Sequence, residues 1–309
     1  MIEVDNLTKC YGHVTAVDSL SFAARPGRVT GFLGPNGAGK TTTMRLILGL
    51  DRPTSGAALV QGRRYREVIR PLLDVGALLD ATAVHPDRSA RSHLLSIARS
   101  NGIGRRRVAA VLQAAGLEAV AGRRIRSFSL GMKQRLGIAA ALLGDPPVLM
   151  FDEPVNGLDP EGTHWIRQLF RSLAAEGRTV FVSSHLMSEM AVTADHLIII
   201  GRGRLLADTS MEDFTSSSAR RDVLVRSPRA GELAGLLTAR GAAVTPEGDS
   251  GLAVAGMDAA AIADLCTARG IPAYELTPRH ASLEQAFMDV TGGSVDYRAP
   301  IPAQERTPV

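Results

Sequence analysis

The 309-residue sequence predicts an α/β fold, in which helices cover both faces of a parallel sheet, followed by a small α+β module. Through the first two thirds of the chain, short apolar runs alternate with helical patterns, as expected for parallel strands joined by crossover helices. Beyond about residue 220, weaker strand and helix patterns follow in the order βαββαβ. We therefore expect two folded parts in one chain.

The first part is predicted to span residues 1–215. Short apolar runs bounded by Gly, Pro and Asp predict buried strands at residues 29–33, 148–151, 179–182 and 197–200. Residues 80–141 differ, because they are rich in arginine and alanine, periodic and poor in strand formers. They predict a helical subdomain inserted into the α/β domain.

The second part, residues 222–292, resembles a ferredoxin-like module. It has expected strands at 222–226, 242–245, 251–254 and 271–277, and expected helices at 230–240, 258–269 and 282–291, the last capped by Ser282. The serine run in residues 215–220 predicts a linker, and the proline-containing residues 294–309 predict a disordered tail. Regulation, dimerisation and bracing of a dimer all stay open as roles for this module.

Composition and charge exclude several classes of protein. An apolar content of 45% excludes a disordered chain, and no apolar run approaches the roughly 18 residues of a membrane-spanning helix. Two cysteines, Cys10 and Cys266, exclude a disulfide framework. The N-terminus lacks the pattern of a secretory signal, which favours the cytoplasm. A net charge of only +4 and 4% aromatic residues give no reason to expect a nucleic-acid partner.

A glycine-rich loop follows the first predicted strand and opens a helix. It fits the pattern G-x-x-x-x-G-K-[ST] and, with the next residue, comprises Gly34, Pro35, Asn36, Gly37, Ala38, Gly39, Lys40, Thr41 and Thr42. Its backbone N–H groups can cradle phosphate oxygens at the N-terminus of the helix. Lys40 is expected to reach the β- and γ-phosphates, and the Thr41 hydroxyl to ligate Mg²⁺.

Two other predicted strands end in polar residues. Asp152 and Glu153 follow residues 148–151, and His185 follows the strand that begins at residue 179. The carboxyl ends of parallel strands face the ligand crevice. Asp152 is therefore expected to hold Mg²⁺, Glu153 to polarise an attacking water, and His185 to contact the γ-phosphate. A strand followed by an acidic turn, or a structural histidine, is the alternative.

Residues 128–135, Phe-Ser-Leu-Gly-Met-Lys-Gln-Arg, resemble the signature sequence of ABC transporter ATPases, usually written L-S-G-G-Q. Ser129 and Gly131 match, whereas the residues around them depart from the common form. The Ser-Leu-Gly-Met variant resembles that of bacterial export ATPases, notably the drug-resistance branch. The resemblance covers about residues 2–213, with the major motifs in family order, and implies a P-loop NTPase core.

The resemblance implies roles for further residues. Tyr11 corresponds to the aromatic residue that stacks on adenine, with a place in the core as the alternative. Asp159 corresponds to the loop that communicates across a dimer. Ser129 and Gly131 would face the γ-phosphate bound by a second subunit, so that ATP joins two head-to-tail ATPase subunits.

One position departs from the family pattern. Where the family usually has a glutamine between the core and the helical subdomain, this chain has Asp80. A carboxylate there can bind Mg²⁺ directly but adds negative charge beside the γ-phosphate. Capping of a loop is the alternative.

These features predict an ATPase that binds ATP and Mg²⁺ and powers export of a drug-like, antibiotic or lipid substrate through a separate membrane permease. The subunit would lie on the inner face of the cell membrane, held there by the permease. An importer ATPase is the alternative. A soluble switch that acts on ribosomes or DNA is less favoured, because such proteins usually carry two cassettes or a long coiled coil, and this chain has one cassette and no heptad run.

Overall fold

A computed structural model describes residues 1–218, 221–248, 250–280 and 283–292. Backbone contacts divide the chain into two units. One comprises Met1–Met211 together with the described residues from Val290 onward, and the other comprises Glu212–Asp289.

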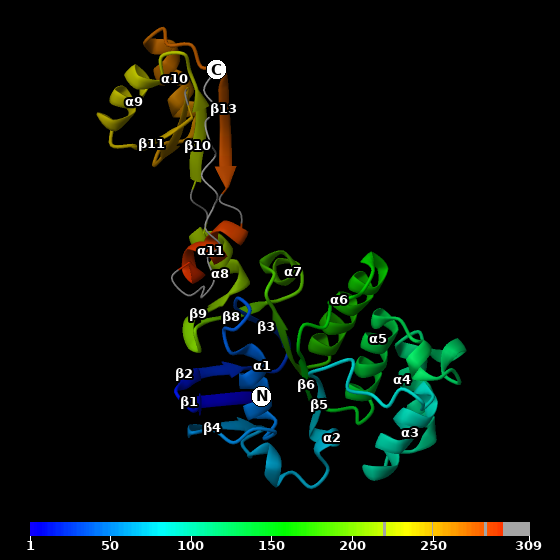
Figure 1. Ribbon diagram of the computed structural model, residues 1–309. Helices are drawn as coiled ribbons and strands as arrows, with labels where there is room; N and C mark the ends of the chain where they lie inside the picture. Colours follow the sequence, from blue (N-terminus) through cyan, green and yellow to red (C-terminus); the bar gives the residue numbers. More distant parts are fainter. Residues whose placement is uncertain (219–220, 249, 281–282, 293–309) are drawn as a thin grey trace, which may run out of the picture. The chain divides into compact units, whose positions relative to one another are not determined.

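The first unit is built on a six-stranded sheet (Figure 1). In spatial order its strands are β5 (Val75–Leu78), β6 (Val148–Phe151), β7 (Thr179–Ser184), β3 (Arg28–Leu33), β8 (His196–Gly201) and β9 (Arg204–Ser210). The first five strands are parallel, and β9 pairs antiparallel with β8 at the edge. The predicted parallel sheet is confirmed, with an antiparallel edge strand that the sequence analysis did not foresee.

A second, antiparallel sheet in this unit was also not foreseen. It has the order β2-β1-β4, with β1 at Ile2–Tyr11, β2 at Val14–Ala24 and β4 at Ser55–Val60. Buried and exposed residues mix along β1 and β2, and the register between them shifts three times. The sequence therefore shows neither a continuous apolar run nor a strict alternation here.

One apolar core joins the two sheets across helix α1 (Lys40–Ile47). Phe22 of β2, Phe32 of β3 and Phe181 of β7 meet in it, with ring centroids 5.1 to 5.6 Å apart. Helix α6 (Pro160–Ala175) packs on β3 and β7, and α7 (Met187–Ala191) packs on β7. Helices thus cover the parallel sheet and fix its strand ends.

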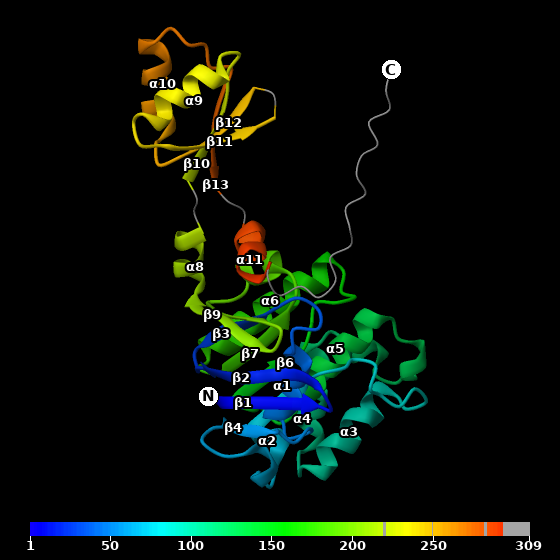
Figure 2. The same ribbon diagram turned by 60° about the vertical axis from the view of Figure 1, so that its left-hand side comes forward.

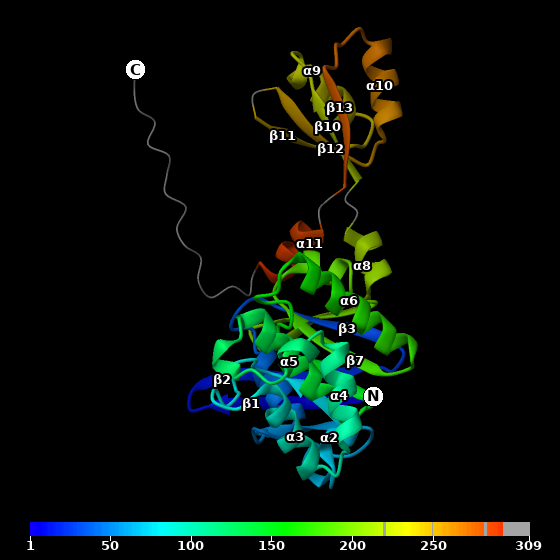
Figure 3. The same cartoon turned by 90° about the vertical axis from the view of Figure 1, so that its right-hand side faces the viewer.

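Three longer helices lie side by side in the region predicted to be helical (Figure 3). They are α3 (Ala90–Ser100), α4 (Arg105–Ala114) and α5 (Leu130–Ala141). The short helix α2 (Pro71–Asp74) precedes β5, and single 3-10 turns occur at Tyr65–Glu67, Glu118–Val120 and Ile125–Ser127.

The second unit has a four-stranded antiparallel sheet with the order β11-β12-β10-β13 (Figure 2). Its elements are α8 (Met211–Ser218), β10 (Arg221–Arg226), α9 (Ala230–Thr238), β11 (Ala243–Glu247), β12 (Gly251–Ala255), α10 (Ala259–Ala268), β13 (Glu275–His280) and α11 (Leu283–Thr291). Helices α9 and α10 lie on one face of the sheet and share its apolar core.

Two boundaries predicted for this region are wrong. The last strand begins at Glu275 rather than at residue 271, because Ile271 still takes part in the turn that ends α10. Its N–H donates to the Cys266 carbonyl oxygen, beyond Gly270 at φ +57°. The predicted linker is helical as far as Ser218, where α8 buries Phe214. The expected Ser282 cap and the tail at residues 294–309 lie outside the described residues.

In the part of the chain that the structure describes, every helix is too short or too polar to cross a bilayer.

Candidate functional site

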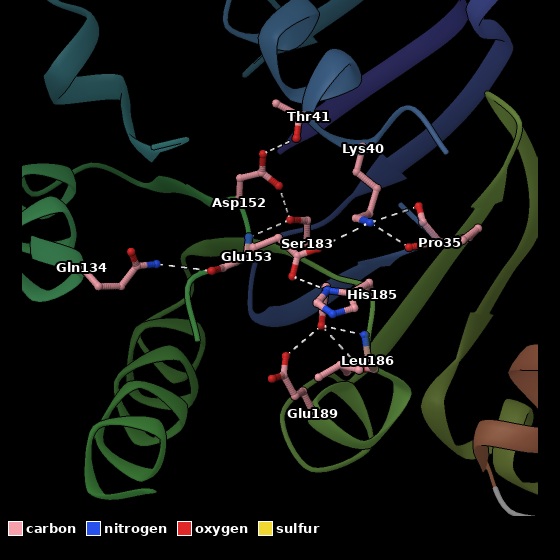
Figure 4. A network of polar contacts seen from close by, with 12 residues as sticks. Pro35, Lys40, Thr41, Gln134, Asp152, Glu153, Ser183, His185, Leu186 and Glu189 are labelled. Carbon is pink, nitrogen blue, oxygen red and sulfur yellow. Dashed lines mark hydrogen bonds and ion pairs between the residues drawn. The ribbon is translucent and has the colours of Figure 1, made fainter. Parts of the chain in front are cut away.

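The carboxyl ends of three neighbouring strands carry the site (Figure 4). Strand β3 leads into the glycine-rich loop, β6 into Asp152 and Glu153, and β7 into His185. Because β6, β7 and β3 are adjacent in the sheet, residues more than 100 positions apart come within hydrogen-bonding distance. The three strand ends, each followed by polar residues, thus lie together at one edge of the sheet.

The glycine-rich loop lines a pocket together with Ala16 of β2 and Glu153. The loop residues in the pocket wall are Asn36, Gly37, Ala38, Gly39, Lys40, Thr41 and Thr42. Gly39 has φ +101°, and a Cβ atom on it would lie 2.5 Å from the Ala16 carbonyl oxygen. Gly34 is equally restricted, since its Cβ would lie 2.6 Å from the Ile200 oxygen. Only glycine fits either position.

Lys40 is the most buried charged side chain of the site, with 6% of its surface exposed. Its ammonium group donates to the carbonyl oxygens of Gly34 at 2.7 Å and Pro35 at 3.3 Å. It also lies 3.4 Å from a carboxylate oxygen of Glu153. Burial lowers the pKa of Lys40, and the nearby Glu153 carboxylate opposes this shift.

The side-chain oxygens of Asp152 and Thr41 lie next to each other. The Thr41 hydroxyl donates to Asp152 Oδ2 at 2.6 Å, and the Ser183 hydroxyl donates to Asp152 Oδ1. Hard oxygen donors of this kind suit Mg²⁺. No group of three or more His, Cys, Asp or Glu side chains that could hold a metal exists among the described residues. A magnesium ion at Thr41 and Asp152 would therefore need phosphate oxygens or water as further ligands.

Glu153 occupies the centre of the polar network in Figure 4. One carboxylate oxygen lies near Lys40, and the other lies 2.9 Å from His185 Nδ1. The backbone of Glu153 has the rare φ of +47°. Ser183 accepts its N–H at 2.9 Å, and Gln134 donates to its carbonyl oxygen at 3.3 Å, so both backbone groups are held.

Two members of this network, Ser183 and Gln134, were not predicted from the sequence. Each is buried, with 0% and 4% of its surface exposed, and each is polar. The available signal was a serine at the end of an apolar strand and a glutamine inside the signature segment. Their hydrogen bonds to the Glu153 backbone depend on the packing of α5 and β7 around β6.

A short turn holds His185 at the end of β7. The Ser184 hydroxyl accepts the Leu186 N–H at 3.0 Å and donates to the Glu189 carboxylate at 2.8 Å. Glu189 belongs to α7, so the turn is tied to the helix that follows it.

Tyr11 lies at the end of β1 with 49% of its surface exposed, which excludes the core position. Its hydroxyl donates to Asp51 at 3.1 Å, and Arg45 binds the same carboxylate at 2.7 Å. The Lys9 ammonium lies 4.7 Å from the ring centroid. The ring is thus held at its edge and contacted by a cation.

Ser129, Gly131 and Asp159 lie together, outside the pocket of the glycine-rich loop. Ser129 caps α5 by accepting the Met132 N–H at 3.2 Å, and Asp159 caps α6 by accepting the Gly162 N–H at 2.8 Å. A Cβ on Gly131 would lie 3.0 Å from the Gly157 oxygen. Two helix N-termini, one from the signature segment and one from the Asp159 loop, are therefore neighbours.

Asp80 is exposed and bonds locally. It accepts from the Thr82 N–H at 2.7 Å and from the Thr82 hydroxyl at 2.6 Å. These bonds hold the pKa of the Asp80 carboxyl below its usual value. The observed bonds are those of the loop-capping alternative.

A glycine-rich phosphate loop, an oxygen pair suited to magnesium and a glutamate beside a histidine define a P-loop NTPase. The model of the family described as ABC transporter matches residues 17–156. The bacitracin transport ATP-binding protein BcrA of Bacillus licheniformis is 42% identical over 214 residues, 67% of this chain and 69% of the relative. The chain belongs to the ATP-binding subunits of ABC transporters, whose ATP hydrolysis is coupled to transport.

Another relative matches nearly the whole chain. The Nod factor export ATP-binding protein I of Ralstonia nicotianae is 34% identical over 301 residues, 94% of each protein. Among solved structures, an ATP-binding subunit of an ABC transporter superposes with a TM-score of 0.65 at 27% identity, covering 70% of this chain and 92% of that one. The dimeric cassette MJ0796 superposes with a TM-score of 0.63 at 26% identity, covering 68% and 99%. Residues 221–284 match a domain of unknown function.

Proposed function

We propose that this chain hydrolyses ATP to drive export of an antibiotic, drug-like or lipid substrate through a separate membrane permease. The observation that carries the proposal is the Lys40–Glu153–His185 arrangement in a chain that resembles transport subunits for bacitracin, lantibiotics and Nod factors. The relatives' names concern transport and export of such compounds, so the importer alternative has no specific support.

Each site residue has a proposed role. The loop N–H groups and Lys40 bind the β- and γ-phosphates of ATP, while Thr41 and Asp152 ligate Mg²⁺. Glu153 orients the water that attacks the γ-phosphate, and His185 contacts both Glu153 and the γ-phosphate. Tyr11 stacks on adenine with its exposed ring.

A second ATPase subunit completes the site in this proposal. The Ser129 hydroxyl, the Gly131 N–H and the N-terminus of α5 form an anion-binding surface that faces the γ-phosphate of the partner. The adjacent Asp159 loop connects this surface to α6. The assembled pair would lie at the inner face of the membrane, bound to the permease.

The test is ATP-dependent transport in inside-out vesicles that contain the chain and its permease. Uptake into such vesicles corresponds to export from the cell and is expected with wild type. Lys40→Ala should abolish uptake, because it removes the positive charge that binds the β- and γ-phosphates. Normal uptake with Lys40→Ala, or ATP-driven movement in the opposite direction, would contradict the proposal.

A further inference from the structure

Charge is distributed unevenly along the chain. Residues 80–141, the helical subdomain, contain 11 basic against 3 acidic residues, a balance of +8. The remaining residues contain 24 basic against 28 acidic residues, a balance of −4. The modest net charge of the whole chain therefore hides a strongly basic subdomain.

Two segments of this subdomain lie side by side and bring five arginines together. The Arg91 N–H donates to the Ala121 oxygen at 2.9 Å, and the Ile125 N–H donates to the Arg88 oxygen at 2.9 Å. Residues 86–91 and 121–126 are thus held in a fixed register. We call the exposed side chains that they carry the arginine patch, which consists of Arg88, Arg91, Arg123, Arg124 and Arg126.

A single acidic residue lies within these two segments. Asp87 Oδ1 lies 3.2 Å from a guanidinium nitrogen of Arg126 and 3.7 Å from one of Arg124. One carboxylate against five guanidinium groups leaves the patch with a local charge of +4. Arg99, Arg105 and Arg106, at the end of α3 and the start of α4, are also exposed.

The surroundings of the patch indicate what kind of partner it fits. Among residues 80–141, all of which the structure describes, Leu130 at the start of α5 is the single exposed large hydrophobic side chain, and it lies outside the two patch segments. Protein-binding hot spots are enriched in Trp, Tyr and Arg and lie in well-packed pockets. This surface has exposed arginines but, among residues 80–141, no exposed aromatic anchor. An anionic membrane surface needs no such anchor, because each arginine near it contributes about 1 kcal/mol through charge alone.

We propose that the arginine patch binds the phosphate groups of an anionic phospholipid surface. The contact is electrostatic and lies at the headgroups, since the five side chains of the patch are arginines and none is apolar. It is therefore reversible and weakened by salt. The helical subdomain would touch the membrane directly, in addition to any contact with the permease. This contact does not depend on ATP hydrolysis.

The experiment is cosedimentation of the full chain with vesicles of phosphatidylcholine alone or mixed with phosphatidylglycerol, at two salt concentrations. Wild type should sediment only with phosphatidylglycerol and less at high salt. Arg88→Gln, Arg91→Gln and Arg123→Gln together should lower vesicle affinity about 100-fold, at roughly tenfold per 1.4 kcal/mol. This triple variant spares the two arginines that bind Asp87.

Two further variants sharpen the test. Asp87→Asn frees Arg124 and Arg126 from their carboxylate and should raise vesicle affinity about fivefold. The control is Arg52→Gln, Arg64→Gln and Arg66→Gln together, which removes the same charge from exposed arginines outside the helical subdomain. The control should bind vesicles nearly as wild type does.

Several results would overturn the proposal. Equal losses in the patch variant and the control would show an effect of net charge alone. If the triple patch variant binds vesicles as wild type does but no longer copurifies with the permease, the patch binds a protein partner instead. Equally tight binding of wild type to duplex DNA would remove the case for lipid. ATP turnover of the variants is measured in parallel, so a failed ATPase assignment is distinguished from a failed lipid assignment.

Discussion

At the scale of single residues, the site depends on Glu153, whose side chain and backbone both have bonding partners. Glu153 lies between Lys40 and His185, with its backbone N–H and carbonyl oxygen bound by Ser183 and Gln134. A carboxylate fixed in this way keeps one orientation, which is what positioning of a water requires.

Glu153→Gln should leave ATP binding intact and lower hydrolysis about 10²- to 10⁴-fold, the usual scale for general acid–base catalysis. Glutamine keeps the size of the side chain but loses the charge. Steady-state phosphate release and equilibrium binding of labelled ATP measure the two effects. Glu161→Gln, an exposed change in the first turn of α6, serves as control. Undiminished hydrolysis by Glu153→Gln would show that Glu153 does not orient the attacking water.

Tyr11→Ala should raise the ATP concentration for half-maximal rate, because stacking on a base contributes roughly 1–3 kcal/mol. Tyr11→Phe keeps the ring and loses only the bond to Asp51, so its half-maximal concentration should stay near that of wild type. If neither change alters the ATP dependence, adenine binds elsewhere.

Asp80→Asn should leave the Mg²⁺ dependence of turnover unchanged, because the Asp80 carboxylate binds Thr82. Asp152→Asn should raise the Mg²⁺ concentration needed, since it removes a charged ligand beside Thr41. A magnesium titration of both variants checks this. A shift with Asp80→Asn as large as that with Asp152→Asn would make Asp80 a metal ligand.

At the scale of elements, the buried Ser183 of β7 forms hydrogen bonds to the two residues that follow β6. Ser183 receives the Glu153 N–H and donates to Asp152, so one hydroxyl connects the ends of two strands. Ser183→Ala should lower the free energy of unfolding by about 1–3 kcal/mol, because both partners lose a buried hydrogen bond. Chemical denaturation measures this, with exposed Ser172→Ala as control. An unfolding free energy equal to that of the control would show that the bridge does not stabilise the fold.

At the scale of the whole molecule, the two units have separate apolar cores. Leu233 of α9 is fully buried in the core of the second unit. Leu233→Ala should destabilise that unit by about 2–5 kcal/mol and leave ATP binding unchanged. Calorimetry with and without ATP should show two unfolding transitions. The mutation should lower the midpoint temperature of one, and ATP should raise the midpoint temperature of the other. A single transition moved by both would show that the units unfold together.

The parallel strands, the glycine-rich loop, the acidic pair after β6 and the order of elements in the second unit could all be predicted from the amino-acid pattern. These features are local, because strand runs, loop glycines and helix periodicity are set by neighbouring residues. For the same reason the sequence indicated which residue types are suited to phosphate and magnesium.

The contacts that these residues make follow from the packing of the folded chain. The antiparallel sheet β2-β1-β4 has too irregular a pattern to stand out in the sequence, and the partners of Glu153 come from β7 and α5. Asp80 bonds to Thr82 rather than to the site, although its position in the chain suited both roles. Five arginines spread over 39 residues form one patch because two segments pair through backbone hydrogen bonds. Such contacts join residues far apart in the chain, and their geometry depends on packing that no local pattern records.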